Sequence, residues 1–231
     1  MIKIKNVVRV FRTGDTDVMA ANDICLTIED AEYVSIVGRS GSGKSTLMNL
    51  IGGLDVPDSG IIEVNGCVIT SFNSNQLAEY RAKETGFVFQ SFHLEPMYTV
   101  YDNIRVALLI SGVRNKEHPE LIRKVLHEVG LESKEKVKVS KLSGGERQRV
   151  SIARAIVNDA PVILADEPCG NLDSVNSAII MKLLRDLNKS GKTVILVTHN
   201  LNDAKMTDRI IELQDGKIIK DEKTIATTVC N

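Results

Sequence analysis

Short apolar runs alternate along the chain with longer segments in which apolar residues recur every three or four positions. The first pattern is typical of strands and the second of helices, so their alternation predicts an α/β fold. Two runs, residues 162–165 and 194–197, are continuously apolar, which is typical of parallel strands buried on both faces. The predicted strands are Ile2–Phe11, Ile24–Ile28, Tyr33–Val37, Ile61–Val64, Gly86–Phe89, Val162–Ala165, Val194–Val197, Arg209–Leu213 and Lys217–Lys220, and the predicted helices are Lys44–Ile51, Gln76–Lys83, Val100–Ser111, Pro119–Val129, Gly144–Val157, Val175–Asn188 and Leu201–Met206.

The section from about residue 92 to 142 has an almost entirely helical pattern and lies between two α/β portions. We therefore expect one domain over residues 1–231. Its mostly parallel core sheet is expected from residues 1–91 and 143–231, and the helical lobe from 92–142 is inserted in it. The early strands, which precede the first Gly-rich turn, are expected to form an antiparallel side sheet.

Composition narrows the class of protein. The 231 residues carry 29 Lys plus Arg and 30 Asp plus Glu, a net charge of −1, so no basic field attracts nucleic acid and no nucleic-acid partner is expected. No apolar run approaches the roughly 20 residues needed to cross a bilayer. The four cysteines lie far apart, which argues against a metal knuckle or a disulfide framework and favours a reducing, cytoplasmic location.

A glycine-rich loop between a predicted strand and a predicted helix is the first candidate binding site along the chain. Residues 38–45 match G-x-x-x-x-G-K-[ST], the phosphate loop whose backbone N–H groups surround phosphate oxygens at the positive end of a helix. In such a loop Lys44 reaches the β- and γ-phosphates, Ser45 binds Mg²⁺ and Thr46 adds a contact to the α-phosphate. This loop alone leaves kinases, GTPases and motors open. The predicted nucleotide-binding residues of the loop are Gly38, Arg39, Ser40, Gly41, Ser42, Gly43, Lys44, Ser45 and Thr46.

Two carboxylates follow a buried strand. Asp166 and Glu167 come directly after residues 162–165, which places them at the carboxyl edge of a parallel sheet, where ligands bind. Asp166 is suited to hold Mg²⁺, and Glu167 is suited to polarise a water that attacks the γ-phosphate. Standing alone, the pair would be a solvated acidic turn; the phosphate loop favours the catalytic interpretation.

A second predicted anion site lies at the start of the helix that begins near residue 144. Ser143 and Glu146 have the spacing of a capping box. Gly144 and Gly145 each cost about 1 kcal/mol relative to Ala in a helix, but they let a ligand approach the backbone closely. Because the chain has one phosphate loop, this second site is predicted to meet a nucleotide held by another copy.

At this point the sequence resembles the ATP-binding subunits of ABC transporters, with Leu142–Val150 similar to the family's signature motif. The resemblance covers about residues 2–220 and implies a P-loop NTPase of ABC type. Further similarity at residues 12–18, 52–55, 86–92 and 170–173 indicates the group that serves lipoprotein release (LolD), macrolide and peptide export (MacB) and cell division (FtsE). Cys169 departs from the family, which commonly has Thr there.

The resemblance also implies roles for single residues. Phe11, at the end of the first predicted strand, would stack on adenine. Gln90 would sense Mg²⁺ and the γ-phosphate, and His199 would contact the γ-phosphate and hold the attacking water. Residues 171–173 would form a loop that crosses a dimer interface. Lys44 would support catalysis as well as binding.

The implied assembly is a head-to-tail dimer with two ATP molecules, each held between one copy's phosphate loop and Ser143–Gly145 of the other. A membrane permease is expected to dock near Ser91–Tyr98, which would place the chain on the cytoplasmic face of the membrane. The implied function is an ATPase that drives export or extraction of a lipoprotein, peptide or macrolide-like compound.

Three other functions stay open. One is a soluble ABC ATPase of ribosomes or chromosomes, although the first type carries two such domains and the second is split by a long coiled coil. Another is a mechanotransmission ATPase of cell division. A nucleoside kinase or GTPase is the third, but the candidate guanine-reading segment, residues 188–191, lacks the necessary Asp.

Overall fold

The structure is a computed structural model, and it describes residues 1–13 and 16–224. The described chain forms two compact units, one from residues 1–77 with the segment that begins at Thr193, the other from residues 78–192. The division at residues 92 and 142 into core and helical lobe stays a prediction. Cys230, Gly14 and Asp15 lie outside the described residues.

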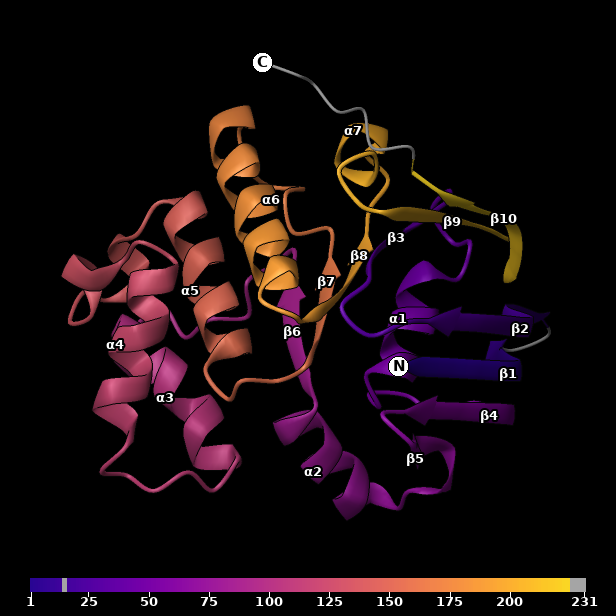
Figure 1. Cartoon of the computed structure of the whole chain (residues 1–231), viewed down its shortest axis with the longest axis horizontal. Helices are drawn as coiled ribbons and strands as arrows, with labels where there is room; N and C mark the ends of the chain where they lie inside the picture. Colours follow the sequence, from indigo (N-terminus) through magenta and orange to yellow (C-terminus); the bar gives the residue numbers. More distant parts are fainter. Residues whose placement is uncertain (14–15, 225–231) are drawn as a thin grey trace. The chain divides into compact units, whose positions relative to one another are not determined.

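The first unit contains a four-stranded antiparallel sheet (Figure 1). Strands β1 (Ile2–Thr13) and β2 (Thr16–Ile28) form a long hairpin, and β4 (Ser59–Val64) pairs with β1 and β5 (Cys67–Val68) with β4. The predicted antiparallel side sheet is therefore present. Strand β1 extends two residues beyond its predicted end at Phe11, because Arg12 pairs with Asp17 and Thr13 pairs with Thr16.

The same unit holds a second, mainly parallel set of strands in the order β10-β9-β3-β8. Strand β3 (Tyr33–Val37) lies between β8 (Thr193–Val197) and β9 (Arg209–Gln214) and is parallel to both, while β10 (Lys217–Lys223) is antiparallel to β9. Every residue of β3 and β8 is buried, which the continuously apolar run 194–197 predicts for β8. Helix α1 (Lys44–Ile51) follows β3, and the short α7 (Leu201–Ala204) follows β8.

Helix α7 ends two residues earlier than its pattern predicts. The Thr207 hydroxyl donates to the carbonyl oxygen of Ala204 at 2.7 Å, and Thr207 Oγ1 also lies 3.0 Å from the carbonyl oxygen of Arg209. A threonine side chain that bonds to the backbone in this way replaces the next helical bond. The chain can then turn directly into β9.

In the second unit, strands β6 (Thr85–Phe89) and β7 (Val162–Asp166) are parallel neighbours. Helix α5 (Gly144–Ile156) packs against β6, α3 (Val100–Ile110), α4 (His118–Glu128) and α6 (Ser174–Lys189). The predicted helix over this segment is confirmed, and Val150, Ala153 and the following Val157 are buried. Helix α2 (Ser74–Lys83) begins in the first unit and ends in the second.

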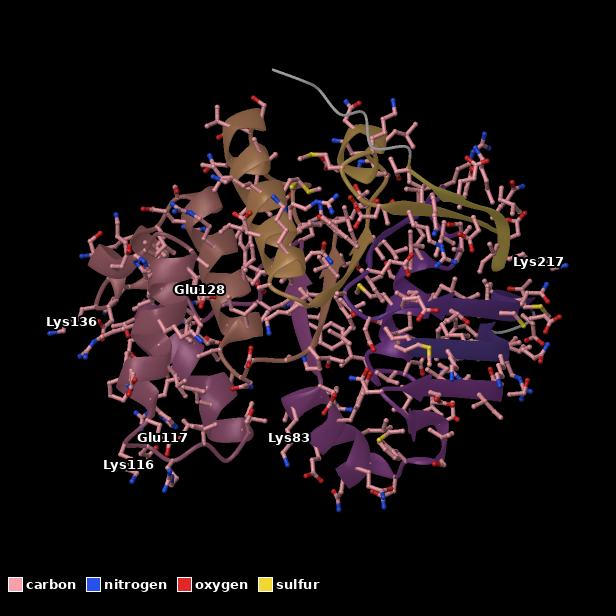
Figure 2. All side chains as sticks on the ribbon, in the orientation of Figure 1. Lys83, Lys116, Glu117, Glu128, Lys136 and Lys217 are labelled. Atoms are coloured by element: carbon pink, nitrogen blue, oxygen red, sulfur yellow. The ribbon has the colours of Figure 1, made fainter. Side chains whose placement is uncertain are left out.

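Short 3₁₀ turns complete the helical segment at Glu132–Lys134 and Val139–Lys141, and a third lies at Ile69–Ser71 in the first unit. Charged side chains such as those of Lys136 and Lys217 point away from the ribbon at the periphery (Figure 2). In the part of the chain that the structure describes, no helix is both long and apolar enough to span a bilayer.

Candidate functional site

The phosphate loop connects β3 to α1, as its sequence context predicts. Gly43 immediately precedes α1 with φ 100°, and a Cβ there would collide with the carbonyl oxygen of Ala20 on β2. Glycine is therefore required for both the left-handed backbone and the close approach of β2. The Gly216 amide donates to the carbonyl oxygen of Ser42 at 3.1 Å, so the turn between β9 and β10 supports the loop from a second direction.

The polar groups of the loop are arranged for an anion. Lys44 Nζ donates to the carbonyl oxygens of Gly38 at 2.9 Å and Arg39 at 2.8 Å, which folds the ammonium group back over the loop. The Ser42 hydroxyl is buried and has no hydrogen-bond partner. Helix α1 has no acidic residue in its first turn, and its cap, Gly43, makes no side-chain hydrogen bond to the start of the helix. A phosphate would satisfy these groups.

His199 lies at the same sheet edge as the phosphate loop. Strands β3 and β8 are parallel, with Ile36 opposite Val197, and the Thr198 amide donates to the carbonyl oxygen of Ile36 at 3.2 Å. The carboxyl ends of these neighbouring strands therefore lead into Gly38 and His199 side by side. The structure thus brings together the predicted γ-phosphate contact and the start of the loop.

Phe11 lies on the hairpin of β1 and β2, opposite Val18. Its side chain is 39% exposed, and the guanidinium carbon of Arg9 lies 4.9 Å from the ring centroid. Arg9 is itself held by Asp55, with Nε and Nη2 donating to the two carboxylate oxygens at 2.9 and 2.8 Å. The ring is therefore both accessible to an aromatic base and restrained by a cation.

The predicted carboxylates and Gln90 meet in the second unit. Phe89 is opposite Asp166 in the parallel pair of β6 and β7, so Gln90 and Glu167 follow at the same edge. Gln90 Nε2 donates to Asn171 Oδ1 at 3.5 Å, and Asn171 Nδ2 returns a bond to the carbonyl oxygen of Gln90 at 3.2 Å. Glu167 has φ 46°, a left-handed conformation that is uncommon for a residue with a long side chain. Such strain gathers at functional sites.

The signature segment starts α5 with the predicted capping box. The Ser143 amide donates to Glu146 Oε2 at 2.8 Å, the Glu146 amide donates to Ser143 Oγ at 3.3 Å, and Lys134 Nζ lies 3.0 Å from Glu146 Oε1. A Cβ on Gly145 would collide with the side chain of Asn176 on α6. The second glycine is therefore required for the packing of α5 on α6, a role that the sequence pattern did not reveal.

We expect acid to weaken this cap. The Ser143 amide, followed by Lys134, holds the pKa of Glu146 below its ordinary value of 4.5. A lowered folded-state pKa gives stability that is present above pH 4.5 and is lost as the pH falls through the folded-state value. Glu146→Gln should therefore lower the free energy of unfolding at pH 7 by roughly 0.3–1 kcal/mol, the range for a charge at a helix start. In urea denaturation the difference between the two proteins should shrink as the pH falls below 4.5 and through the lowered folded-state pKa. A difference that stays constant with pH would contradict the ion pair's role.

The predicted docking segment is accessible. Met97 is 68% exposed and Tyr98 59% exposed. Beside them lies a hollow of about 310 Å³, whose walls join this segment to the turn before α5 and to α5 itself. The lining residues are Ser91, Phe92, Leu94, Pro96, Val139, Ser140 and Arg147.

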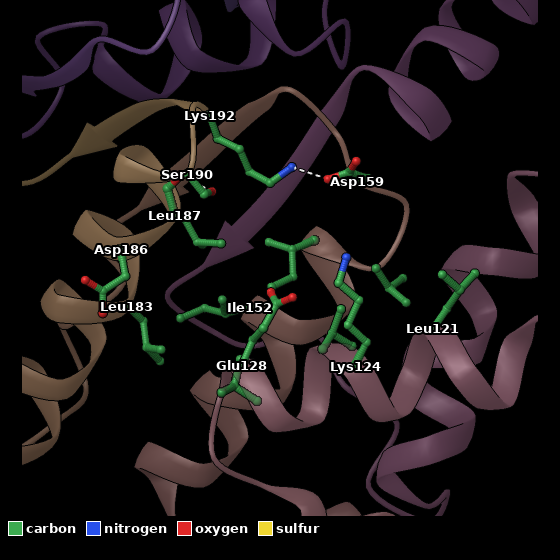
Figure 3. A pocket seen from close by; sticks show the side chains of 14 residues that line it. Leu121, Lys124, Glu128, Ile152, Asp159, Leu183, Asp186, Leu187, Ser190 and Lys192 are labelled. Atoms are coloured by element: carbon green, nitrogen blue, oxygen red, sulfur yellow. Dashed lines mark hydrogen bonds and ion pairs between the residues drawn. The ribbon is translucent and has the colours of Figure 1, made fainter.

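A larger cavity of about 500 Å³ lies between α4, α5 and α6 (Figure 3). Apolar side chains such as Leu121 and Ile152 form its walls, and the ion pair of Lys192 with Asp159, 2.7 Å between Nζ and Oδ1, lies at its rim. None of the predicted site residues lines it.

The residues predicted to bind Mg²⁺ are Ser45, Asp166 and Gln90. Within residues 1–13 and 16–224, no three His, Cys, Asp or Glu side chains come together in a way that could hold a metal ion on their own. The hydroxyl, amide and single carboxylate predicted to bind Mg²⁺ fit this, because Mg²⁺ in nucleotide sites is held by few protein oxygens together with phosphates and water.

Comparison with known proteins identifies the family. The family model for "ABC transporter" matches residues 21–170. The chain is 46% identical over 221 residues to the macrolide export ATP-binding/permease protein MacB of Vibrio parahaemolyticus, and 43% identical over 231 residues to the probable syringafactin export ATP-binding/permease protein SyfD of Pseudomonas syringae. These matches cover 96% and 100% of this chain, but 34% and 35% of the relatives. The chain thus spans about a third of the length of the curated relatives it matches.

Two solved structures share this fold over nearly the whole chain. The dimeric post-hydrolysis structure of the ATP-binding cassette MJ0796 with ADP and Pi is 39% identical, with a TM-score of 0.89 and coverage of 97% of this chain and 99% of that one. A second dimeric structure of MJ0796, a bacterial ABC transporter cassette, is 40% identical with the same TM-score and coverage. The predicted recognition, ABC-type α/β fold and ATPase class are confirmed. This chain belongs to the ABC transporter family.

Proposed function

We propose that this chain is the ATP-binding and ATP-hydrolysing subunit of an ABC transporter complex, and that it acts in export. The observation that carries the proposal is the open phosphate loop, with the Lys44 ammonium folded over it and the Ser42 hydroxyl buried without a partner. The family match and the solved ATP-binding cassettes support the same nucleotide. The full length of the loop, Gly38 to Thr46, would cradle the phosphates, and Phe11 would stack on the adenine.

Hydrolysis would use residues from four strand ends. Mg²⁺, when bound with ATP by Ser45, Asp166 and Gln90, would neutralise charge that develops on the phosphates. Glu167 would accept a proton from the attacking water, and Lys44 would stabilise the β- and γ-phosphates. His199 would hold the γ-phosphate from the neighbouring strand end.

The active assembly would be a head-to-tail dimer. The signature segment, Ser143 to Gly145, begins a helix whose N–H groups can bind an anion, yet it lies in the unit without the phosphate loop. The MJ0796 cassette with ADP and Pi is a dimer, which supports two copies sharing the nucleotides. ATP would then close the dimer, and loss of the γ-phosphate would let it open.

A membrane permease would dock on Ser91–Tyr98, which would hold the chain at the cytoplasmic face of the membrane. The exposed Met97 and Tyr98 and the hollow beside them support this surface. The names of MacB and SyfD, a macrolide export and a probable syringafactin export ATP-binding/permease protein, support export, with a lipoprotein, a peptide or a macrolide-like compound as the candidate cargo. Affinity capture from solubilised membranes, with this chain as bait, tests the permease partner. We expect recovery of an integral membrane permease. Recovery of ribosomes or cell-division proteins alone would favour a soluble ABC ATPase or a mechanotransmission ATPase.

Lys44→Ala should lower ATP affinity by at least tenfold. The substitution removes the ammonium group folded over the phosphate loop, and a charge-assisted phosphate contact contributes about 1.5–3 kcal/mol. Isothermal titration calorimetry with ATP and Mg²⁺ measures the change. Lys83→Ala, at an exposed helical lysine paired with Glu79, is the control and should bind as the native chain does. A native ATP affinity in the Lys44→Ala variant would contradict the assignment of the phosphate loop to the nucleotide site.

A further inference from the structure

Two consecutive residues that follow Gln90 have a strained backbone. Phe92 has φ 57° and His93 has φ 48°, both in the left-handed region that side chains other than glycine's disfavour. Each such residue persists only where surrounding contacts hold it. The two residues lie in the middle of the segment that connects Gln90 to the proposed docking surface.

Arg154 of α5 makes the contacts that hold this turn. Its Nη2 donates to the carbonyl oxygen of Phe92 at 2.8 Å, and its Nη1 donates to the carbonyl oxygen of His93. The His93 ring also meets the Phe89 ring edge-on, with centroids 4.9 Å apart. Burial lowers the pKa of Arg154, but a guanidinium group stays protonated in proteins. One planar fork thus fixes two successive carbonyl groups.

The residue before Gln90 is fixed from the same helix. Gln148 is fully buried, and its Nε2 donates to the carbonyl oxygen of Phe89 at 3.3 Å. Gln90 therefore lies between two anchored stretches of backbone, one held by Gln148 and one by Arg154. Both anchors belong to α5, whose first residues form the signature segment.

We propose that Gln148 and Arg154 form a clamp, the α5 clamp, which makes the signature helix and the docking segment Ser91–Tyr98 move as one body and positions Gln90. Arg154 is a positioning residue in this clamp, since it acts through the backbone of Phe92 and His93. The proposal rests on the proposed function only in the roles of Gln90 and of the docking surface. The clamp itself is a physical connection that can be tested without ATP.

The test is hydrogen exchange on the full chain, comparing native protein with Arg154→Met and Arg154→Lys. Arg154→Met should speed exchange at the amides of Phe92, His93 and Tyr98 at least tenfold, and Arg154→Lys, which keeps one donor group, should give a smaller increase and covers the case in which Arg154→Met fails to fold. The matched control is Arg149→Met. Arg149 lies on the same helix and donates from Nη1 to the carbonyl oxygens of Val129 and Gly130, both at 3.1 Å.

Arg149→Met should loosen residues 129–131 and leave 91–98 unchanged. Folded Arg154 variants with native exchange in residues 91–98 would overturn the clamp. An equal increase in residues 91–98 of the Arg149→Met control would overturn it as well.

A kinetic measurement tests whether the clamp positions Gln90. Arg154→Met should lower kcat at least tenfold and keep ATP affinity within twofold. Raised exchange with a native kcat would overturn the positioning of Gln90. A native chain without any ATP hydrolysis would instead refute the proposed function, and the exchange result would still decide the clamp.

Discussion

Glu167→Gln is expected to reduce ATP hydrolysis by about a thousandfold, within the range for loss of a general base, while ATP affinity stays native. The amide keeps the size of the side chain and can still hold water, but it cannot accept the proton that the attacking water must lose. Because the γ-phosphate then persists, ATP should accumulate a closed dimer. Phosphate release under saturating ATP and Mg²⁺ measures turnover, and light scattering measures the dimer.

Glu128→Gln is the control for that experiment. Glu128 is exposed near the end of α4, where it lines the larger cavity, which contains none of the proposed site residues. The Glu128→Gln variant should hydrolyse ATP at the native rate and should show no trapped dimer. If Glu167→Gln also hydrolysed ATP at the native rate, Glu167 would not be the base, and another group at the sheet edge would have to accept the proton.

Ser143→Arg is expected to abolish ATP-dependent dimers and to leave ATP binding by the single chain intact. The exposed Ser143 caps α5, and in the proposed dimer it faces a nucleotide held by the other copy. A long cationic side chain at this position would therefore fill the space between the two copies in the dimer interface. Loss of the cap itself costs about 1 kcal/mol, which is too little to unfold a domain. The measurement is light scattering in a Glu167→Gln background, with and without ATP.

Thr99→Arg provides a matched control, because Thr99 caps α3 in the same kind of capping box, with Asp102 as its partner. The Thr99→Arg variant loses an equivalent helix cap and gains the same side chain, but at a helix start outside the proposed dimer interface. Dimers should form normally in that variant. Normal dimers in Ser143→Arg would contradict a nucleotide shared between two copies.

The parts of the site that could be predicted are those that short, contiguous stretches of sequence determine. The phosphate loop needs glycine at Gly43 and a lysine next to it, between one strand and one helix, and the observed β3 and α1 have the predicted bounds. Asp166 ends β7 and Glu167 follows it, and the apolar run 162–165 identifies this strand in the sequence. The capping box of Ser143 and Glu146 is likewise set by a spacing of three residues.

The parts that could not be predicted depend on contacts between distant segments. The bond from Gln148 to Phe89 joins residues 59 positions apart, and the bonds from Arg154 to Phe92 and His93 span about as far. A buried Gln on an apolar helix face was the available signal, but its partner follows only from the packing of α5 on β6. The hairpin of β1 and β2 was predicted too short because its polar end, including Arg12 and Asp17, pairs without an apolar pattern.

The central claim is that one copy's phosphate loop faces the signature segment of another copy when ATP is bound. Disulfide-length crosslinking of Ser40→Cys to Ser143→Cys tests it most directly, in a Glu167→Gln chain whose cysteines 25, 67, 169 and 230 are replaced by Ser; Ser40 and Ser143 are both exposed. We expect a covalent dimer that forms with ATP and Mg²⁺ and is absent without nucleotide. No crosslink with ATP, or an equal yield without it, would contradict the shared site.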